Sequence, residues 1–466
     1  MAIALFLCPK AGCFRFFQTP TPRSFQINRN LSDRCLIRSP RLSDQKISWK
    51  TATALVIANM VGTGVFTSLG FQLLDVRNTV SIVLLWLIGG FLALFGAFSY
   101  AQLGTHFKES GGDYIYLSRI FHPVLGYLTS WASLVVGFSA PVAIAAIAMT
   151  QYLAPFGIEG SRWLAVSIIV LVGLMHSFSI RQSERFQNVT TVLKIGFVVL
   201  LILLGFIYST DVTPAITFGS GWMREVTTPG FAVSLVYVTY AYTGWNAAAY
   251  IVEEIRDVQK SLPKALILGT LVVTVLYVLL QLVFLRNASY AQLEGKIEVA
   301  TVAFSNVFGA NGSRWISFFI AIQLVATISA YIWIGSRVTH AMSKEHSLWK
   351  PLRPVSAQRI PLRTIWLHVA ISVGLALTGT FEQILLYTGF ILQLMGTLVV
   401  ASVLFLKKRP DTFQSPFYPY AQYIFIGFSL WILAYTLYDK PVESLIGLGI
   451  IGAGLVTYFF NKQEQP

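Results

Sequence analysis

The sequence has little charge, little cysteine and few acidic residues, and each shortage excludes a class of protein. Only 12% of the 466 residues are charged, about half the fraction of a soluble domain, while 55% are hydrophobic and the mean hydropathy is +0.65. One chain cannot hide so much apolar surface from water, which excludes a disordered protein, a coiled coil and an ordinary soluble enzyme. The solvent for most of the chain is therefore lipid.

Metal, cofactor and nucleic-acid sites also find no support in the composition. The three cysteines, Cys8, Cys13 and Cys35, precede the first long apolar run and lack zinc-ligand spacing. We therefore expect no structural disulfide, no metal site and no cofactor. The net charge is +14, but no segment can form the basic face of a nucleic-acid-binding domain. Nucleic acid is not an expected partner.

About twelve apolar runs are long enough to cross a bilayer. They are expected at 50–75, 79–105, 123–154, 162–180, 186–208, 229–254, 264–285, 314–341, 364–381, 383–406, 417–438 and 441–461. With Met1 placed in the cytoplasm, 26 Lys and Arg fall on the inner side, 7 on the outer side and Lys194 within a span. The positive charge therefore reflects topology. We expect a multi-pass protein of the plasma membrane with both termini cytoplasmic.

Residues 1–49 form a basic N-terminal segment that contains Ser and Pro and few acids. Its short apolar start lacks the charged n-region of a signal peptide. We expect a cytoplasmic tail or an over-extended start of the chain, with an organellar transit peptide as the alternative.

Two predicted spans, the first and the sixth, carry glycine and small polar residues near their middle. Residues 57–66 read IANMVGTGVF and residues 240–246 read YAYTGWN. A lone Gly-x-Gly indicates close helix packing, but unwound backbone within a bilayer must be buried in protein or line a cavity. The same defect five helices apart predicts an all-α membrane fold of two inverted five-helix repeats, 50–208 and 229–406. Two further helices follow in 417–461.

A broken helix presents free N–H groups at one half and free carbonyls at the other, which suit a carboxylate and an ammonium group. An α-amino acid carries both groups, so it is the expected substrate. We assign the carboxylate to Thr63 and Gly64 and the amine to carbonyls near Met60, Tyr240 and Thr243. The expected substrate-binding residues are Met60, Gly62, Thr63, Gly64, Tyr240, Thr243, Gly244 and Asn246.

No Asp or Glu lies in the middle of spans one, three, six, eight or ten. A buried carboxylate is the expected partner of an amine ligand that has no carboxylate of its own. This shortage disfavours polyamines and monoamines and, more weakly, cationic amino acids.

Lys194 is the one basic residue well inside a span. It lies about nine residues into the fifth span, roughly 13 Å along the helix, which is far for a side chain that must reach the interface. We expect it to replace a sodium ion on the carbonyls freed in span one and to serve as the coupling residue. Loss of hydration disfavours its charged form and so permits proton coupling, but the sequence does not show whether it titrates. His176 is interpreted as a packing residue.

Three residues near the sixth span are expected to gate the path. Tyr240 is positioned to cap the substrate, and Trp245 follows it, although core packing is the alternative for both aromatics. Glu254 ends the span next to Glu253 and several basic residues. It is assigned to a salt-bridge network at the inner gate, with ordinary interfacial charge as the alternative.

Several motifs over most of residues 48–408 resemble the amino acid–polyamine–organocation superfamily, whose permeases adopt the LeuT-type fold. They are residues 57–66, Gly111–Tyr116 (GGDYIY), 241–246 running into 253–257 and 262–265, and Ser336-Arg337 followed by Ala341-Met342. The sixth-span motif is similar to the L-type amino acid transporter branch, although Val258 stands where a Pro is common. The resemblance implies that Thr63 and Gly64 hold the carboxylate, that Tyr240 is the gate and that Asn246 polarises the break. It also aligns Lys194 with a lysine of sodium-independent members.

The sequence therefore predicts a sodium-independent permease, not an enzyme, that moves neutral L-amino acids by alternating access as a proton symporter or an exchanger. A permease or exchanger for cationic amino acids or polyamines is the first alternative, with Glu382 as a source of negative charge. A membrane sensor or enzyme on a transporter fold is a remote one. Expected partners are the amino acid, protons and the lipid bilayer. The sequence does not decide whether an accessory subunit binds.

Overall fold

The computed structural model describes residues 46–460 except 159–160, 179, 209, 211, 213, 217–218, 357–359 and 408. The side chains of 180–191 also lie outside the described part, as do the three cysteines and the predicted tail up to residue 45. The described residues form an all-helical fold. Their one strand-like feature is an isolated parallel bridge between Ile47 and Ile255.

Eight helical segments of the described chain are long and apolar enough to cross a membrane. The described chain also has shorter apolar helices at Arg162–Phe178, Val192–Ile207, Pro229–Ala241 and Leu362–Thr378. In chain order the elements are α1 (Trp49–Met60), α2 (Gly64–Gln72), α3 (Thr79–Phe107), α4 (Asp113–Ile120), α5 (Pro123–Ala132), η1 (Ser133–Phe138), α6 (Ser139–Tyr152), η2 (Ala154–Phe156), α7 (Arg162–Phe178), α8 (Ile180–Ile207), α9 (Trp222–Glu225), α10 (Pro229–Ala241), η3 (Ala247–Glu254), α11 (Val258–Asn287), α12 (Tyr290–Leu293), α13 (Val299–Glu345), η4 (Ser347–Leu352), α14 (Leu362–Thr378), α15 (Phe381–Ser402), η5 (Val403–Phe405), α16 (Tyr420–Asp439) and α17 (Pro441–Phe459).

The predicted breaks in the first and sixth spans are confirmed. In the first, α1 ends at Met60 and α2 begins at Gly64. In the sixth, α10 ends at Ala241, a turn follows, and the chain continues as the 3-10 helix η3. Gly244 in this turn has a φ of +101°, which glycine adopts without the steric strain that other residues would meet.

Three predicted spans begin at least six residues earlier in the structure, because composition does not mark the ends of helices that continue through polar residues. The span expected at 186–208 begins at Ile180, the first residue of α8. The span expected at 264–285 begins six residues earlier, since α11 starts at Val258 and includes the polar residues Gln259 and Lys260. The span expected at 314–341 is part of α13, which runs from Val299 to Glu345 with a kink at Gly309. The positive φ of Gly309, +69°, produces the kink.

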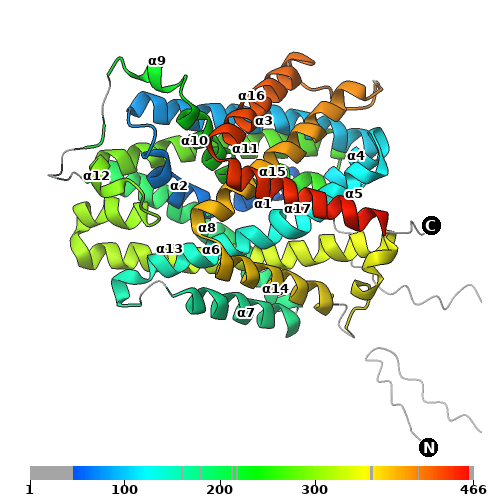
Figure 1. The fold of residues 1–466 in the computed structure, drawn as a ribbon, viewed down its shortest axis with the longest axis horizontal. Coiled ribbons are helices and arrows are strands. Elements are labelled where there is room, and N and C mark those ends of the chain that lie inside the picture. Colours follow the sequence, from blue (N-terminus) through cyan, green and yellow to red (C-terminus); the bar gives the residue numbers. More distant parts are fainter. Residues whose placement is uncertain are drawn as a thin grey trace, which may run out of the picture. The chain divides into compact units, whose positions relative to one another are not determined.

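The broken helices lie inside the bundle, where α1 and α2 are surrounded by other helices, while α7 and α14 lie together at one edge (Figure 1). Helix α1 packs chiefly on α11, and α2 on α10. All nine residues of α2 are buried. The two predicted breaks are therefore held side by side in protein, as an unwound segment in a bilayer requires.

The loops collect at two ends of the bundle. We call the end at which α1 begins the N-side face. There Ile47 pairs with Ile255, and the amide N–H of Glu253 donates to Ser110 Oγ at 3.2 Å. The opposite face carries the ion pair of Arg77 and Glu294, at 2.8 Å.

Candidate functional site

The two helix breaks interlock through their glycines. A Cβ atom at Gly64 would lie 2.6 Å from the Cα of Ala241 on α10, and one at Gly244 would lie 2.7 Å from the carbonyl carbon of Asn59 on α1. Both distances are well inside van der Waals contact. Each break therefore needs glycine where it meets the other broken helix.

The unwound part of the first span leaves donors free. Among the described residues, the backbone N–H groups of Gly62, Thr63, Gly64 and Val65 donate to no backbone carbonyl. They stand at the N-terminus of α2, where the helix dipole favours negative charge. Thr63 is buried and its hydroxyl caps no helical N–H. This is the arrangement that a carboxylate needs, at the residues that the sequence indicated.

The free carbonyls are fewer than expected, because some are already occupied. The Tyr277 hydroxyl of α11 lies 2.6 Å from Met60 O and 3.2 Å from Ala241 O, so it bridges the two breaks. Tyr240 O accepts from both the N–H and the hydroxyl of Thr243, at 3.0 and 2.7 Å. Of the three carbonyls predicted for the amine, Met60 O keeps a second lone pair, and Thr243 O accepts from no backbone or side-chain donor among the described residues.

Tyr277 is a site residue that sequence reasoning missed. It is fully buried, and Gln281, one turn further along α11, donates from Nε2 to Val65 O at 3.1 Å. Residues four apart share a helix face, so this pair was visible as two polar groups on one side of an apolar span. Nothing in their spacing, however, indicates that they face the break.

Lys194 lies where the sequence placed it. Its Nζ donates to Val61 O at 3.3 Å and to Thr327 Oγ1 of α13 at 2.9 Å, and the residue is 5% exposed. Thr327 Oγ1 donates in turn to Gln323 O, so it acts as an acceptor toward the lysine. The ammonium group thus joins the break in span one to α13 through two oxygen ligands.

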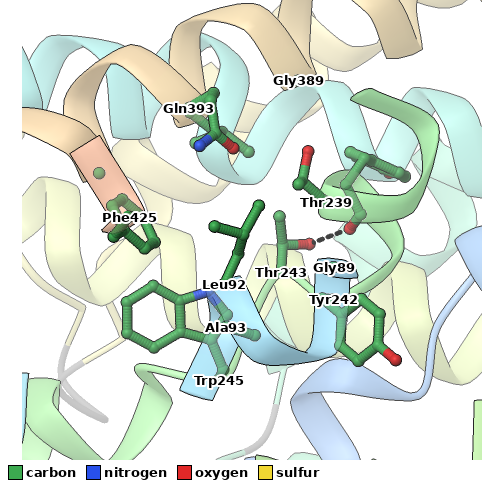
Figure 2. Close-up of a pocket in the computed structure, with 13 residues that line it drawn as sticks. Gly89, Leu92, Ala93, Thr239, Tyr242, Thr243, Trp245, Gly389, Gln393 and Phe425 are labelled. Carbon is green, nitrogen blue, oxygen red and sulfur yellow. Dashed lines mark hydrogen bonds between the residues drawn. The ribbon is translucent and has the colours of Figure 1, made fainter. Parts of the chain in front are cut away.

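A cavity of about 60 Å³ lies beside the break in span six, between α3, α10, α15 and α16. Figure 2 shows Leu92, Trp245, Phe425 and Gln393 around it, with the hydrogen bond from the Thr243 hydroxyl at its rim. None of the lining residues is charged. They are Gly89, Leu92, Ala93, Thr239, Tyr240, Tyr242, Thr243, Trp245, Gly389, Leu392, Gln393, Gly396 and Phe425.

Of the residues assigned to gating, Tyr240 and Trp245 line this cavity, and Tyr240 is 5% exposed. Glu254 is different: its side chain is exposed and forms no ion pair among the described residues, while its carbonyl accepts from the N–H of Ile47 at 2.7 Å. The contact at this end that involves Glu254 is therefore main-chain pairing rather than the expected salt bridge. The side chain of Asn246 lies toward Tyr250, with Nδ2 3.5 Å from the hydroxyl, and not toward the cavity.

The remaining polar candidates have local partners. His176 lies 2.8 Å from Ser329 Oγ, in keeping with its interpretation as a buried packing residue. Glu382 accepts from the Tyr237 hydroxyl at 2.8 Å and lies 3.9 Å from Lys440 on the opposite face, outside the cavity lining. No three His, Cys, Asp or Glu side chains converge as metal ligands in the described part of the chain.

Comparison with known proteins gives a family. The amino acid permease family model matches residues 47–460. The chain belongs to this family. It is 26% identical to the human cystine/glutamate transporter over 89% of its own length and 85% of the relative. It is 27% identical to the human large neutral amino acids transporter small subunit 2, over 90% and 81%, and 26% identical to the mouse b(0,+)-type amino acid transporter 1, over 89% and 87%.

The predicted class of protein is thereby confirmed. The permease is a multi-pass membrane transporter of amino acids, not an enzyme. The names of the relatives cover neutral amino acids as well as cystine and glutamate, so they leave open which side chains this permease accepts.

Proposed function

We propose that this permease is a sodium-independent transporter of neutral L-amino acids, which it carries by alternating access as a proton symporter or an exchanger. The observation that carries the proposal is the interlocked pair of breaks, which holds the free N–H groups of Gly62–Val65 in one break and the Thr243 carbonyl in the other. A zwitterion satisfies both sets at once. In this proposal backbone groups bind the part that all amino acids share, and the cavity beside the break in span six, which Tyr240 and Thr243 line, receives the side chain.

The uncharged lining of the cavity favours neutral side chains. An ionised side chain placed there would lose its hydration without gaining an opposite charge, which costs far more than burying a neutral group. Glu382, the acid considered for cationic substrates, is engaged with Tyr237 on the opposite face. This geometry supports neutral amino acids over the cationic alternative.

Sodium independence is supported by the position of Lys194. Its ammonium group donates hydrogen bonds to Val61 O and Thr327 Oγ1, two oxygens that would otherwise suit a small cation. A second positive charge beside it would be repelled strongly in a low-dielectric interior. Because Lys194 contacts the break itself, a change in its protonation would act directly on the substrate-binding backbone.

The proposed architecture is a LeuT-type fold of twelve spans. The first repeat covers 50–208 and the second 229–406, each beginning with a broken helix, and 417–461 adds two helices. The excess of Lys and Arg at the N-side face supports a cytoplasmic position for that face and for both termini, in the cell membrane.

Competition for uptake tests the proposed substrate class. The purified permease in liposomes should take up labelled leucine equally well with sodium or choline outside. Excess unlabelled leucine or glutamine should inhibit this uptake, whereas arginine, glutamate and putrescine should not. Inhibition by arginine or putrescine equal to that by leucine would favour the cationic alternative, and a requirement for sodium would contradict the role of Lys194.

A further inference from the structure

A buried carboxylate lies at the N-side face, away from the proposed substrate site. Asp113 is the first residue of α4, the short helix between the second and third spans, and it is 9% exposed. The Tyr100 hydroxyl of α3 donates to Asp113 Oδ1 at 2.5 Å, and the Tyr250 hydroxyl of η3 also bonds to this carboxylate. Asp113 therefore joins three elements, one of which is the inner half of the broken sixth span.

The glycine before Asp113 allows this contact. Gly112 has a φ of +53°, and a Cβ on it would lie 2.5 Å from the Tyr250 ring. Only glycine lets the loop lie flat on that ring while α4 begins at the next residue. Gly112 and Asp113 of the GGDY sequence are thus explained by packing against Tyr250 of η3.

The same half-helix is held by main-chain bonds from two other segments. Ile47 N donates to Glu254 O at 2.7 Å and Arg256 N donates to Ile47 O at 3.0 Å, so the residues before α1 pair with the end of η3. The N–H of Glu253 donates to Ser110 Oγ in the loop before α4. If η3 moves away from α3, the contacts of Asp113 with Tyr100 and Tyr250 cannot both persist.

We propose that Asp113 is a gating residue that latches η3 to α3 and α4 at the N-side face, and that acidification of that side holds the latch closed. The inference rests on the alternating access of the proposed function, but not on the identity of the substrate. In the closed state the carboxyl group is buried between tyrosines. In the open state water reaches it.

Burial raises the pKa of the Asp113 carboxyl from 3.8 to about 6, and the hydroxyls of Tyr100 and Tyr250 oppose this rise only partly. The closed state therefore binds the proton more tightly than an open, hydrated state. By linkage, lowering the pH through 6 favours the closed state, and raising it favours the open state. As the pH falls from 7 to 5, the ratio of closed to open permease should rise roughly tenfold.

No charged side chain of the described residues contributes to this pKa shift. Of the elements packed on α4, α5 and α15 carry only Tyr127, Tyr387 and Glu382 as titratable residues, and Glu382 lies at the opposite face. The titratable residues of α3, α4 and η3 are Tyr100, His106, Tyr114, Tyr116, Arg119, Tyr250, Glu253 and Glu254, besides Asp113 itself.

Cysteine labelling tests the latch without a transport assay. All three native cysteines precede residue 36, so their replacement by serine leaves the described part unchanged. Val252→Cys is the reporter, because Val252 is fully buried with its side chain against Gly104 of α3. Glu253→Cys, at an exposed neighbour, gives the rate of an open thiol at each pH. The quantity of interest is the ratio of the two maleimide labelling rates in the purified permease.

This ratio should fall about tenfold from pH 7 to pH 5. In an Asp113→Asn background it should be low at both values, since the amide resembles the protonated acid and does not titrate. Tyr100→Phe, which removes a hydrogen bond that lowers the pKa, should move the midpoint to higher pH. It also provides a second variant if Asp113→Asn does not elute as folded protein.

Three results would overturn the proposal: a ratio that does not change with pH, a pH dependence that persists in Asp113→Asn, or a Val252→Cys thiol that is never labelled. Histidines of this face such as His106 are intact in Asp113→Asn, so a dependence caused by them would persist. None of these results bears on leucine binding, so failure of the latch and failure of the proposed substrate are distinguishable.

Discussion

The substitution Gly64→Ala tests whether the two breaks must touch. The new methyl group would lie 2.6 Å from both the Cα and the Cβ of Ala241, whereas carbon atoms in good contact are about 3.5–4.0 Å apart. The broken helices must then separate by roughly 1 Å. Overpacking of this kind lowers the free energy of unfolding by about 1–3 kcal/mol. The cost falls on the segment that positions the free N–H groups, so leucine uptake should be lost as well.

Gly62→Ala is the matched control, because the same methyl group added two residues earlier would meet no atom closer than 3.8 Å. Thermal unfolding of both purified variants, followed by tryptophan fluorescence, should show a lower midpoint for Gly64→Ala and an unchanged one for Gly62→Ala. Equal midpoints for the two variants would refute the interlocking of the breaks.

Three further substitutions give separate tests. Gly244→Ala should destabilise the purified permease by about 1–3 kcal/mol in thermal unfolding, because of its positive φ and its contact with Asn59, and a wild-type midpoint would contradict this. Lys194→Met should lower uptake driven by an inward proton gradient at least tenfold, while Lys264→Met, at an exposed position on α11, should leave it unchanged; equal rates in both variants would show that Lys194 only packs. Gln393→Leu, in the cavity lining, should shift the ratio of glutamine to leucine uptake about tenfold toward leucine, and an unchanged ratio would exclude the cavity as the side-chain site.

Much of the fold was predictable from the sequence, because lipid imposes long apolar runs and leaves few other solutions. The breaks at 57–66 and 240–246 could also be located, since glycine and small polar residues are rare in the middle of such runs. The exact ends of α11 and α13 could not, because those helices continue through polar residues at the membrane surface.

Contacts within the candidate site could be predicted where a single residue violates a rule. Lys194 was visible as a charge in an apolar span. A buried ammonium group needs oxygen partners, and the unwound backbone of the first span offers one in Val61 O. Tyr277 was not, since a tyrosine in a membrane helix is ordinary and its role depends on which helix it faces. Glu254 attracted attention by its charge, whereas the contact that this structure shows is made by its carbonyl, which accepts from Ile47.

The measurement that tests the central claim most directly is uptake of labelled leucine into liposomes that contain the purified permease and are loaded with either buffer or unlabelled leucine, with and without an inward proton gradient. The proposed function predicts sodium-independent uptake that is stimulated by internal leucine if the permease is an exchanger, or by the proton gradient if it is a symporter. Absence of leucine uptake under all four conditions, from protein that elutes as a folded species, would contradict the proposal that it carries neutral amino acids.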